Sequence, residues 1–173
     1  MDRSSVEELY DCATGFVIDD IPHLMEHSIE VQLPFMRALF PSARLVPVLM
    51  GKPSRRNMNI LARSLSVVFG ARRERTLTVV SSTLASSTES VRAEAKAAWV
   101  LDLIQARDWE GILDASSQDE HPCGLPCLAA WLASTLAGGT QPRILATSDT
   151  TSIEEYEGEY TAKYAAIAME SLQ

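Results

Sequence analysis

Cysteine is scarce in this sequence, and its spacing has no regularity of the kind that a metal site or a disulfide framework needs. The 173 residues contain three cysteines, Cys12, Cys123 and Cys127, and the first residues do not have the pattern of a secretory signal. An odd number of cysteines without paired spacing is typical of a reducing compartment, where thiols stay free. We therefore expect free thiols and a cytoplasmic location.

Positive charge and long apolar runs are also in short supply. Fifteen Lys and Arg side chains stand against 23 Asp and Glu, which gives a net charge of −8. Nucleic acid and anionic membrane surfaces attract cationic proteins, so an acidic chain disfavours both as partners. No apolar stretch approaches the about 18 residues of a membrane-spanning helix. The sequence predicts no nucleic-acid partner and no membrane partner.

What the sequence has is an alternation of strand-like and helix-like segments. Apolar residues make up 46% of the chain, which is ordinary for one soluble domain. Apolar, β-branched runs predict strands at 15–19, 43–51, 75–82, 142–148 and 161–170. Apolar residues three and four apart predict helices at 3–12, 28–39, 60–70, 88–107, 109–116 and 124–139. This order predicts one α/β domain over residues 1–173, with a largely parallel or mixed sheet flanked by helices.

A loop rich in hydroxyl groups follows the predicted strand 75–82. Its side chains are Ser81, Ser82, Thr83, Ser86, Ser87 and Thr88. Ligands collect at the carboxyl ends of strands in α/β sheets, so these hydroxyls could bind a phosphate or another anion. The alternative, which we favour, is that Ser87 or Thr88 caps the next helix and the others satisfy local backbone groups. The G-x-S-x-G motif of a serine nucleophile is absent.

Cys123 is a second candidate because it stands directly before a predicted helix. The unpaired N–H groups of a helix start favour a thiolate, His121 is close by, and Gly124 leaves room for a close approach. The alternative is that Cys123 and Cys127 are small apolar side chains that fill space, as free cysteines usually are.

Glu26 and His27 form the third candidate, in the stretch "MEHSIEVQLPFM". His23 lies four residues before His27, and two histidines at that spacing on a helix can share a metal ion. The pair precedes the periodic helix, however, and lacks the glutamate of an H-E-x-x-H motif. Taken alone, His27 fits a hydrogen-bonded residue at a helix start.

Several stretches together resemble the Memo family, which is similar in fold to the class III extradiol ring-cleavage dioxygenases. In chain order they are "EHSIEVQLPF", "RLVPVLMG", "LTVVSS", "PCG" and "KYAAIAM". The resemblance covers nearly all of this chain but only the second part of a full Memo-like protein. It implies a truncated domain of the Memo and extradiol-dioxygenase type.

The resemblance implies a site that is incomplete in this chain. The family's "PHAGY"-like and "SHH"-like motifs, which carry metal-site histidines, do not occur here. The family has Asp-x-x-His after its "SS" strand, where this chain has Thr83, Leu84, Ala85 and Ser86. Glu26 and His27 match the family's "EHS" motif. Cys123 matches its "CGxxP" motif, although Pro126 comes one residue early.

These departures predict a Memo-like domain that has lost catalysis and acts as a binding or structural unit. It would self-associate as a homo-oligomer or bind a partner chain that supplies the missing half. The rival is a metal-dependent, dioxygenase-like enzyme half whose site another chain completes. A metal-free thiol activity at Cys123 is a third possibility.

The predicted site has few members and no assigned metal ligand. Its vestigial catalytic residues are Glu26, His27 and Cys123, and its ligand-binding residues are Ser81, Ser82, Thr83 and Ser86. We expect these two groups to converge in the fold. No cofactor is expected, and Fe(II), Cu or Zn would bind only if a residual site persists.

Overall fold

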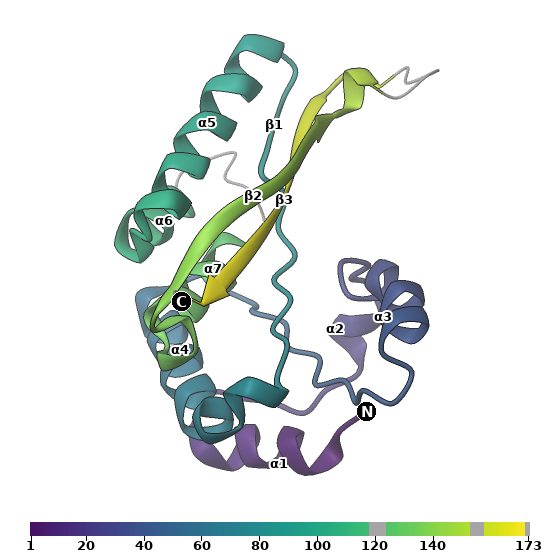
Figure 1. Ribbon diagram of the computed structural model, residues 1–173, viewed down its shortest axis with the longest axis vertical. Helices are drawn as coiled ribbons and strands as arrows, with labels where there is room; N and C mark the ends of the chain where they lie inside the picture. The colour runs from purple at the N-terminus through teal and green to yellow at the C-terminus, as the bar shows by residue number, and fades with distance from the viewer. Residues whose placement is uncertain (118–123, 153–157, 172–173) are drawn as a thin grey trace.

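The computed structural model describes residues 1–117, 124–152 and 158–171 (Figure 1). The α-helices are α1 (Arg3–Cys12), α2 (Ile21–Leu24), α3 (Leu33–Leu39), α4 (Arg55–Phe69), α5 (Ser90–Ala106), α6 (Trp109–Ala115) and α7 (Leu125–Ala133). Short 3-10 helices are η1 (Glu30–Gln32), η2 (Gly70–Arg75), η3 (Thr135–Ala137) and η4 (Thr150–Ser152). The strands are β1 (Ala85–Ser87), β2 (Thr140–Asp149) and β3 (Thr161–Ser171).

The fold is a mixed α/β fold, as predicted, and its described strands pair antiparallel. They form one sheet in the order β1-β3-β2. β2 and β3 follow each other directly along the chain, and neighbouring strands joined in this way pair antiparallel without a helical crossover. Their ladder is long and contains one irregularity, between Ile144 and Ala146. Both strands lie where the sequence predicts them.

Three other predicted strands do not form. Residues 43–51 and 75–82 contain no strand, and 15–19 take part only in an isolated bridge between Thr14 and Phe16. Figure 1 shows the chain around 41–53 and 76–84 as extended coil. A strand is defined by its ladder, so a run with the right side chains remains coil where no neighbouring backbone pairs with it.

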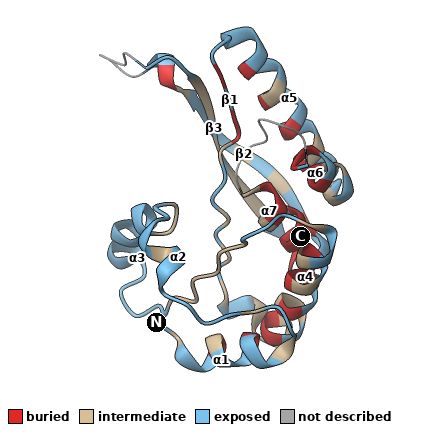
Figure 2. Ribbon diagram, turned by 180° about the vertical axis from the view of Figure 1, so that it is seen from behind, coloured by how far each residue is buried: buried red, intermediate tan, exposed pale blue. Residues whose placement is uncertain are grey.

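The core lies among helices α1 and α4 to α7 and strand β1, with the inner side chains of β3 packed against it. Figure 2 shows the buried residues concentrated on these helices, where Met58, Ile112 and Leu125 are almost completely shielded. α4 begins at a cap, because the Ser54 hydroxyl accepts a hydrogen bond of 3.1 Å from the Asn57 N–H. α7 is shorter than the predicted helix 124–139, since Ser134 adopts an extended conformation after it.

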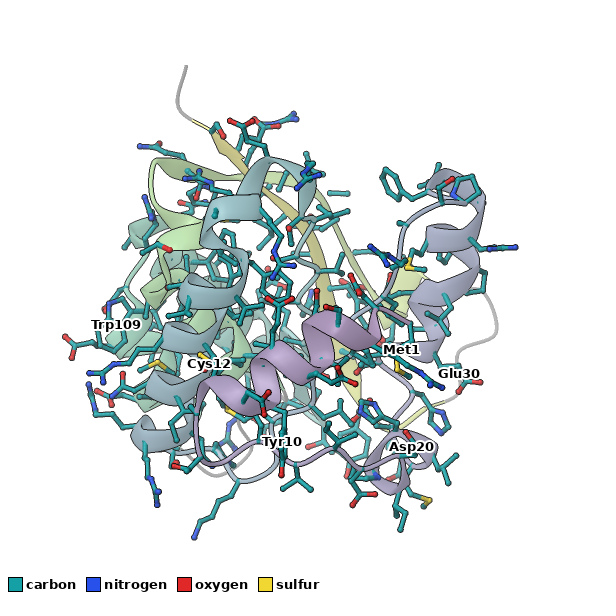
Figure 3. All side chains as sticks on the ribbon, turned by 90° about the horizontal axis from the view of Figure 1, so that it is seen from below. Met1, Tyr10, Cys12, Asp20, Glu30 and Trp109 are labelled. Carbon is teal, nitrogen blue, oxygen red and sulfur yellow. The ribbon has the colours of Figure 1, made fainter. Side chains whose placement is uncertain are left out.

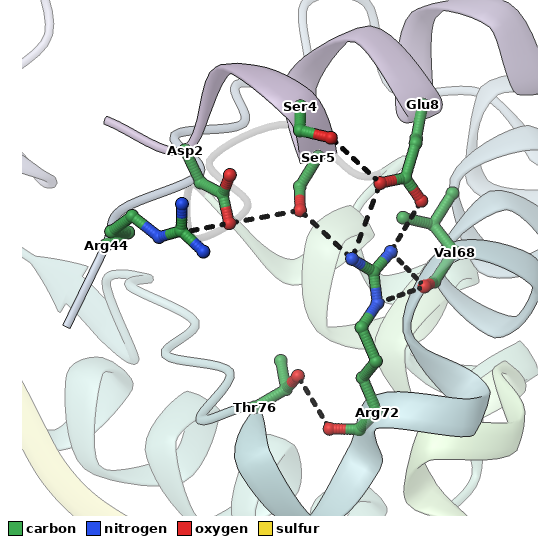
Figure 4. A network of polar contacts seen from close by, with 8 residues as sticks. All are labelled: Asp2, Ser4, Ser5, Glu8, Arg44, Val68, Arg72 and Thr76. Atoms are coloured by element: carbon green, nitrogen blue, oxygen red, sulfur yellow. Dashed lines mark hydrogen bonds and ion pairs between the residues drawn. The ribbon is translucent and has the colours of Figure 1, made fainter.

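One arginine attaches the N-terminal helix to this core. Arg72 donates to the Glu8 carboxylate at 2.6 Å and to the Val68 carbonyl at 2.6 and 3.0 Å (Figure 4). A longer contact of 3.4 Å reaches the buried Ser5 hydroxyl. The guanidinium therefore connects α1 with the end of α4, using several of its five donors.

Residues 17–40, which include α2, η1 and α3, form an arm with little packing. Figures 1 and 2 both show α2 and α3 set apart from the sheet, in the pale blue of exposed residues in Figure 2. Seen from below in Figure 3, the labelled Glu30 of this arm lies across the molecule from Trp109 of α6. The exposed apolar side chains of the arm are Val17, Ile18, Ile21, Leu24, Met25, Val31, Leu33, Phe35, Leu39 and Phe40.

The predicted helix 28–39 is divided in this arm. Its first turn is the 3-10 helix η1, and the α-helix starts at Leu33. Pro34 stands in the first turn of α3, where a missing N–H removes no hydrogen bond, so the proline starts the helix and does not kink it. Among all the residues that the structure describes, no helix has both the length and the apolar character to cross a bilayer.

Candidate functional site

Glu26 and His27 are surface residues that organise their own turn. The Glu26 carboxylate accepts a hydrogen bond of 2.7 Å from the Ser28 N–H. This N–H, followed by the Ser28 hydroxyl, holds the pKa of Glu26 below its ordinary range. The His27 carbonyl accepts from the Val31 N–H at 3.1 Å. His27 therefore lies in the turn before η1, whose N-cap is Ile29, and its carbonyl takes part in that turn.

The His27 ring faces a carboxylate of the same turn. Its Nδ1 lies 3.1 Å from Glu30 Oε2, and both side chains are more than two thirds exposed to solvent. A contact between two side chains this exposed adds little to stability. His23 and His27 do not share a helical face, because α2 ends at Leu24. The structure therefore places one imidazole and one carboxylate together here.

The hydroxyl residues after 75–82 are divided between a coil and a strand. Ser81 and Ser82 are exposed, Thr83 is half-buried, and Ser86 lies in β1 opposite Ala162. The Ser82 hydroxyl donates to the Thr83 carbonyl at 3.1 Å. The buried Ser87 hydroxyl accepts from the Glu89 N–H at 3.2 Å, directly before α5. Ser87 thus satisfies a local backbone group before α5, but the N-cap of α5 is Glu89 and no side-chain hydrogen bond caps the helix, so the predicted cap by Ser87 or Thr88 is wrong.

Gly124 brings the start of α7 against this coil. A Cβ atom at Gly124 would lie 2.3 Å from the Ser81 carbonyl oxygen and 2.8 Å from Ser82 Cβ. Gly124 also has a φ of +88°, in the left-handed region. Cys123 of the "PCG" motif lies outside the described residues. Of this motif, the structure shows the contact of Gly124 with Ser81 and Ser82.

The next cysteine, Cys127, is structural. Its thiol is half-buried, and burial raises its pKa, an effect that the Met50 backbone N–H partly offsets. A raised pKa keeps the thiol protonated and poorly nucleophilic. Cys12 is a half-buried free thiol that packs beside the core.

The two predicted patches occupy different parts of the fold. Ser81 and Ser82 meet Gly124 beside the sheet, whereas Glu26 and His27 lie in the exposed arm between α2 and η1. A hollow of about 310 Å³ is lined by Gly70–Arg75, and a smaller one of about 80 Å³ lies between Gly15, Leu49 and Ile60. Neither hollow is lined by a predicted site residue.

The described residues do not fit the metal centre that the resemblance implies. A dioxygenase-type Fe(II) site uses two histidines and one carboxylate on one face. The chain has three histidines, and outside residues 118–123, 153–157 and 172–173 no three His, Cys, Asp or Glu side chains are grouped to hold a metal ion. His27 with Glu30 supplies two such donors.

The structure contains a partly buried cluster of charged side chains that no sequence pattern indicated. Lys163 of β3 donates to Asp149 of β2 at 2.8 Å and forms an ion pair with Glu94 of α5. The Lys163 side chain is only 16% exposed. Lys163 and, after it, the Thr151 hydroxyl lower the pKa of Asp149 to about 2. The three charged residues are far apart in sequence, so no local spacing could have identified them.

Comparison with known proteins identifies relatives along almost the whole chain. A family model described as Memo-like protein matches residues 1–165. A MEMO1 family protein of Caldivirga maquilingensis is 32% identical over 154 residues, which are 87% of this chain and 54% of that protein. One of Methanosarcina mazei is 27% identical over 168 residues, 94% of this chain and 62% of that protein. One of Thermoplasma acidophilum is 50% identical over 46 residues, which are 26% of this chain and 17% of that protein.

The chain spans roughly half to three fifths of the length of the two relatives that align along most of it. No solved structure matches the chain. A family model that covers residues 1–165 of 173 leaves one conclusion, which is that this chain belongs to the Memo-like protein family.

Proposed function

We propose that this chain is a Memo-like domain without catalysis of its own, which acts as a binding or structural unit. One observation carries the proposal. Where the family resemblance places Asp-x-x-His, this chain has Thr83, Leu84, Ala85 and Ser86, and the last two of these belong to β1. Neither a carboxylate nor an imidazole is available at these positions to bind a metal ion or move a proton.

A surface suited to a partner supports the binding role. The arm 17–40 exposes a run of large apolar side chains, among them Ile21, Met25 and Phe35, each at least two thirds exposed. Contiguous exposed apolar surface in a protein often marks an interaction site. Self-association or a partner chain would remove this surface from water, and the free thiols of Cys12 and Cys127 are compatible with a cytoplasmic location.

An enzyme half that a second chain completes is the alternative function. It is favoured by the contact of Gly124 with Ser81 and Ser82, which places the residue after Cys123 beside the hydroxyl coil. Glu26 and His27 would then have to approach that place together with the second chain's ligands.

Metal titration tests whether this chain holds a metal site by itself. The purified chain is titrated anaerobically with Fe(II), Cu and Zn, together with the variants His27→Ala and Cys123→Ser and the control His23→Ala. We expect no stoichiometric binding in any of the four proteins. Stoichiometric binding that is lost in His27→Ala or Cys123→Ser, but kept in His23→Ala, would contradict the proposal and support the enzyme half.

The binding role has a separate measurement. Molar mass from light scattering over a range of concentrations shows whether the chain self-associates, and mixing experiments show whether another chain binds it. A chain that stays monomeric and takes up no partner would contradict the binding role even when no metal binds.

A further inference from the structure

Residues 77–81 have an extended backbone that pairs with no other described segment, and Thr76 just before them donates its N–H to the Arg73 carbonyl. In the described structure, no backbone-to-backbone hydrogen bond involves residues 77–81, whereas the same chain pairs regularly with β3 from Ala85 onward. An extended segment with unused N–H and C=O groups is a template on which another strand can form a ladder.

The side chains of this segment alternate as in a strand. Thr76, Thr78 and Val80 are half-buried, and Val80 packs against the core. Leu77 and Val79 point away from the core and are 72% and 63% exposed. Apolar side chains on both faces are typical of a strand in the interior of a sheet, where another layer covers the outer face.

β3 is open along the same side. Among the described residues, its pairing with β1 covers only Thr161, Ala162 and Lys163, while its pairing with β2 continues to Ser171. The segment 76–81 continues β1 past the point where its ladder with β3 ends. A second extended segment, 46–49, also lacks backbone partners among the described residues, although Val46 and Val48 pack against the core. In the described structure, two extended segments, 76–81 and 46–49, therefore lack a neighbouring strand.

We propose that residues 76–81 accept a β-strand from the part of the Memo-like fold that this chain does not match, and that Leu77 and Val79 anchor the added layer. This inference rests on the proposed binding role and states which residues form the binding surface. More than a third of the Caldivirga maquilingensis and Methanosarcina mazei relatives has no counterpart in the alignment, which is enough chain for strands and a covering layer. A second copy fits less well, because each copy carries a net charge of −8.

Hydrogen exchange tests the inference directly. The probe is the recombinant portion of the Caldivirga maquilingensis relative that lies outside the match, mixed with the complete 173-residue chain. We expect the amides of residues 77–81 to exchange rapidly in the chain alone and about tenfold or more slowly in the mixture, because ladder hydrogen bonds protect them.

Two variants locate the binding surface. Leu77→Asp should weaken binding of the probe by about tenfold or more, since it places a charge in an interface that must lose its water. The melting temperature of the chain alone should not change, because the Leu77 side chain is largely exposed there. Val67→Asp on α4 is the matched control: Val67 is also 72% exposed, and its substitution should leave binding unaltered.

Three results would overturn the inference. One is a mixture in which residues 77–81 gain no protection, and a second is binding that Leu77→Asp and Val67→Asp affect equally. The third is a dimer of the chain itself that protects 77–81 and is lost in Leu77→Asp, which would assign the surface to a second copy. Protection confined to the arm 17–40 is one form of the first result, and it would overturn this surface while the binding role itself stands.

Discussion

At the scale of single residues, Gly124 determines how closely the start of α7 approaches the coil at Ser81 and Ser82. Gly124 has a positive φ and lies against the Ser81 carbonyl, so both its backbone and its missing side chain are needed. Gly139 has a positive φ of 68°, but a Cβ atom at this position would have no neighbour within 4 Å. The two glycines therefore separate the cost of backbone strain from the cost of a steric clash.

We expect Gly139→Ala to lower the free energy of unfolding by about 1–2 kcal/mol, the cost of a left-handed conformation with a side chain. Gly124→Ala should lower it by about 1–3 kcal/mol more, because the added methyl group must displace the backbone at Ser81 and Ser82. Urea unfolding followed by circular dichroism measures both. Equal losses in the two variants would mean that the coil moves away without cost.

At the scale of elements, the cluster around Lys163 connects the β2–β3 hairpin to helix α5. Asp149 and Glu94 approach the same ammonium group from a strand and a helix. The pKa of Asp149 is lowered from 3.8 to about 2, and that of Lys163 is raised by Asp149 first and then by Glu94. Both shifts favour the charged forms in the folded state.

The cluster predicts a defined pH dependence. A lowered Asp149 pKa contributes stability above pH 3.8 and loses it as the pH falls to about 2. The raised Lys163 pKa contributes below 10.5 and loses it above that value. Lys163→Met should therefore be less stable than the original chain near neutral pH, and this difference should shrink as the pH falls through the acid window.

Urea midpoints measured over that acid range test the prediction, with the exposed Lys52→Met as control. The Lys52→Met chain should follow the original chain at every pH. A difference between Lys163→Met and the original chain that stays constant down to about pH 2 would contradict the role of Asp149.

At the scale of the whole molecule, stability and exposed apolar surface occupy separate regions. The buried core belongs to α1, β1 and the layer α4 to α7, whereas the arm 17–40 is exposed. Met58 at 0% exposure and Phe35 at 67% represent the two regions. A buried side chain raises the free energy of unfolding because it makes packing contacts and is removed from water, and truncating it loses both effects. An exposed side chain has few contacts and is already in water, so truncating it changes little.

Met58→Ala should lower the free energy of unfolding by about 2–5 kcal/mol. Phe35→Ala should change it by no more than about 0.5 kcal/mol, although Phe35 is the larger side chain. Chemical denaturation of the two variants provides the comparison. A large loss in Phe35→Ala would show that the arm packs on the body of the protein in solution.

The sequence by itself determined the features that depend on near neighbours. Periodicity located α5, α6, β2 and β3, and the hydroxyl groups before α5 indicated local hydrogen bonds to the backbone, one of which Ser87 accepts from the Glu89 N–H. It also determined the family, because the ordered motifs correspond to the family model that matches residues 1–165. These features depend on residues a few positions apart, so a linear pattern contains them.

Only the tertiary structure decided which distant segments meet. It placed Gly124 against Ser81, joined Lys163 to Asp149 and Glu94, and left the strand-like residues 76–81 without a ladder. It also placed Glu26 and His27 in an exposed arm, although the motif gives no sign of their surroundings. Strand pairing and long-range contacts depend on which backbone lies alongside, and a segment's own side chains do not specify that neighbour.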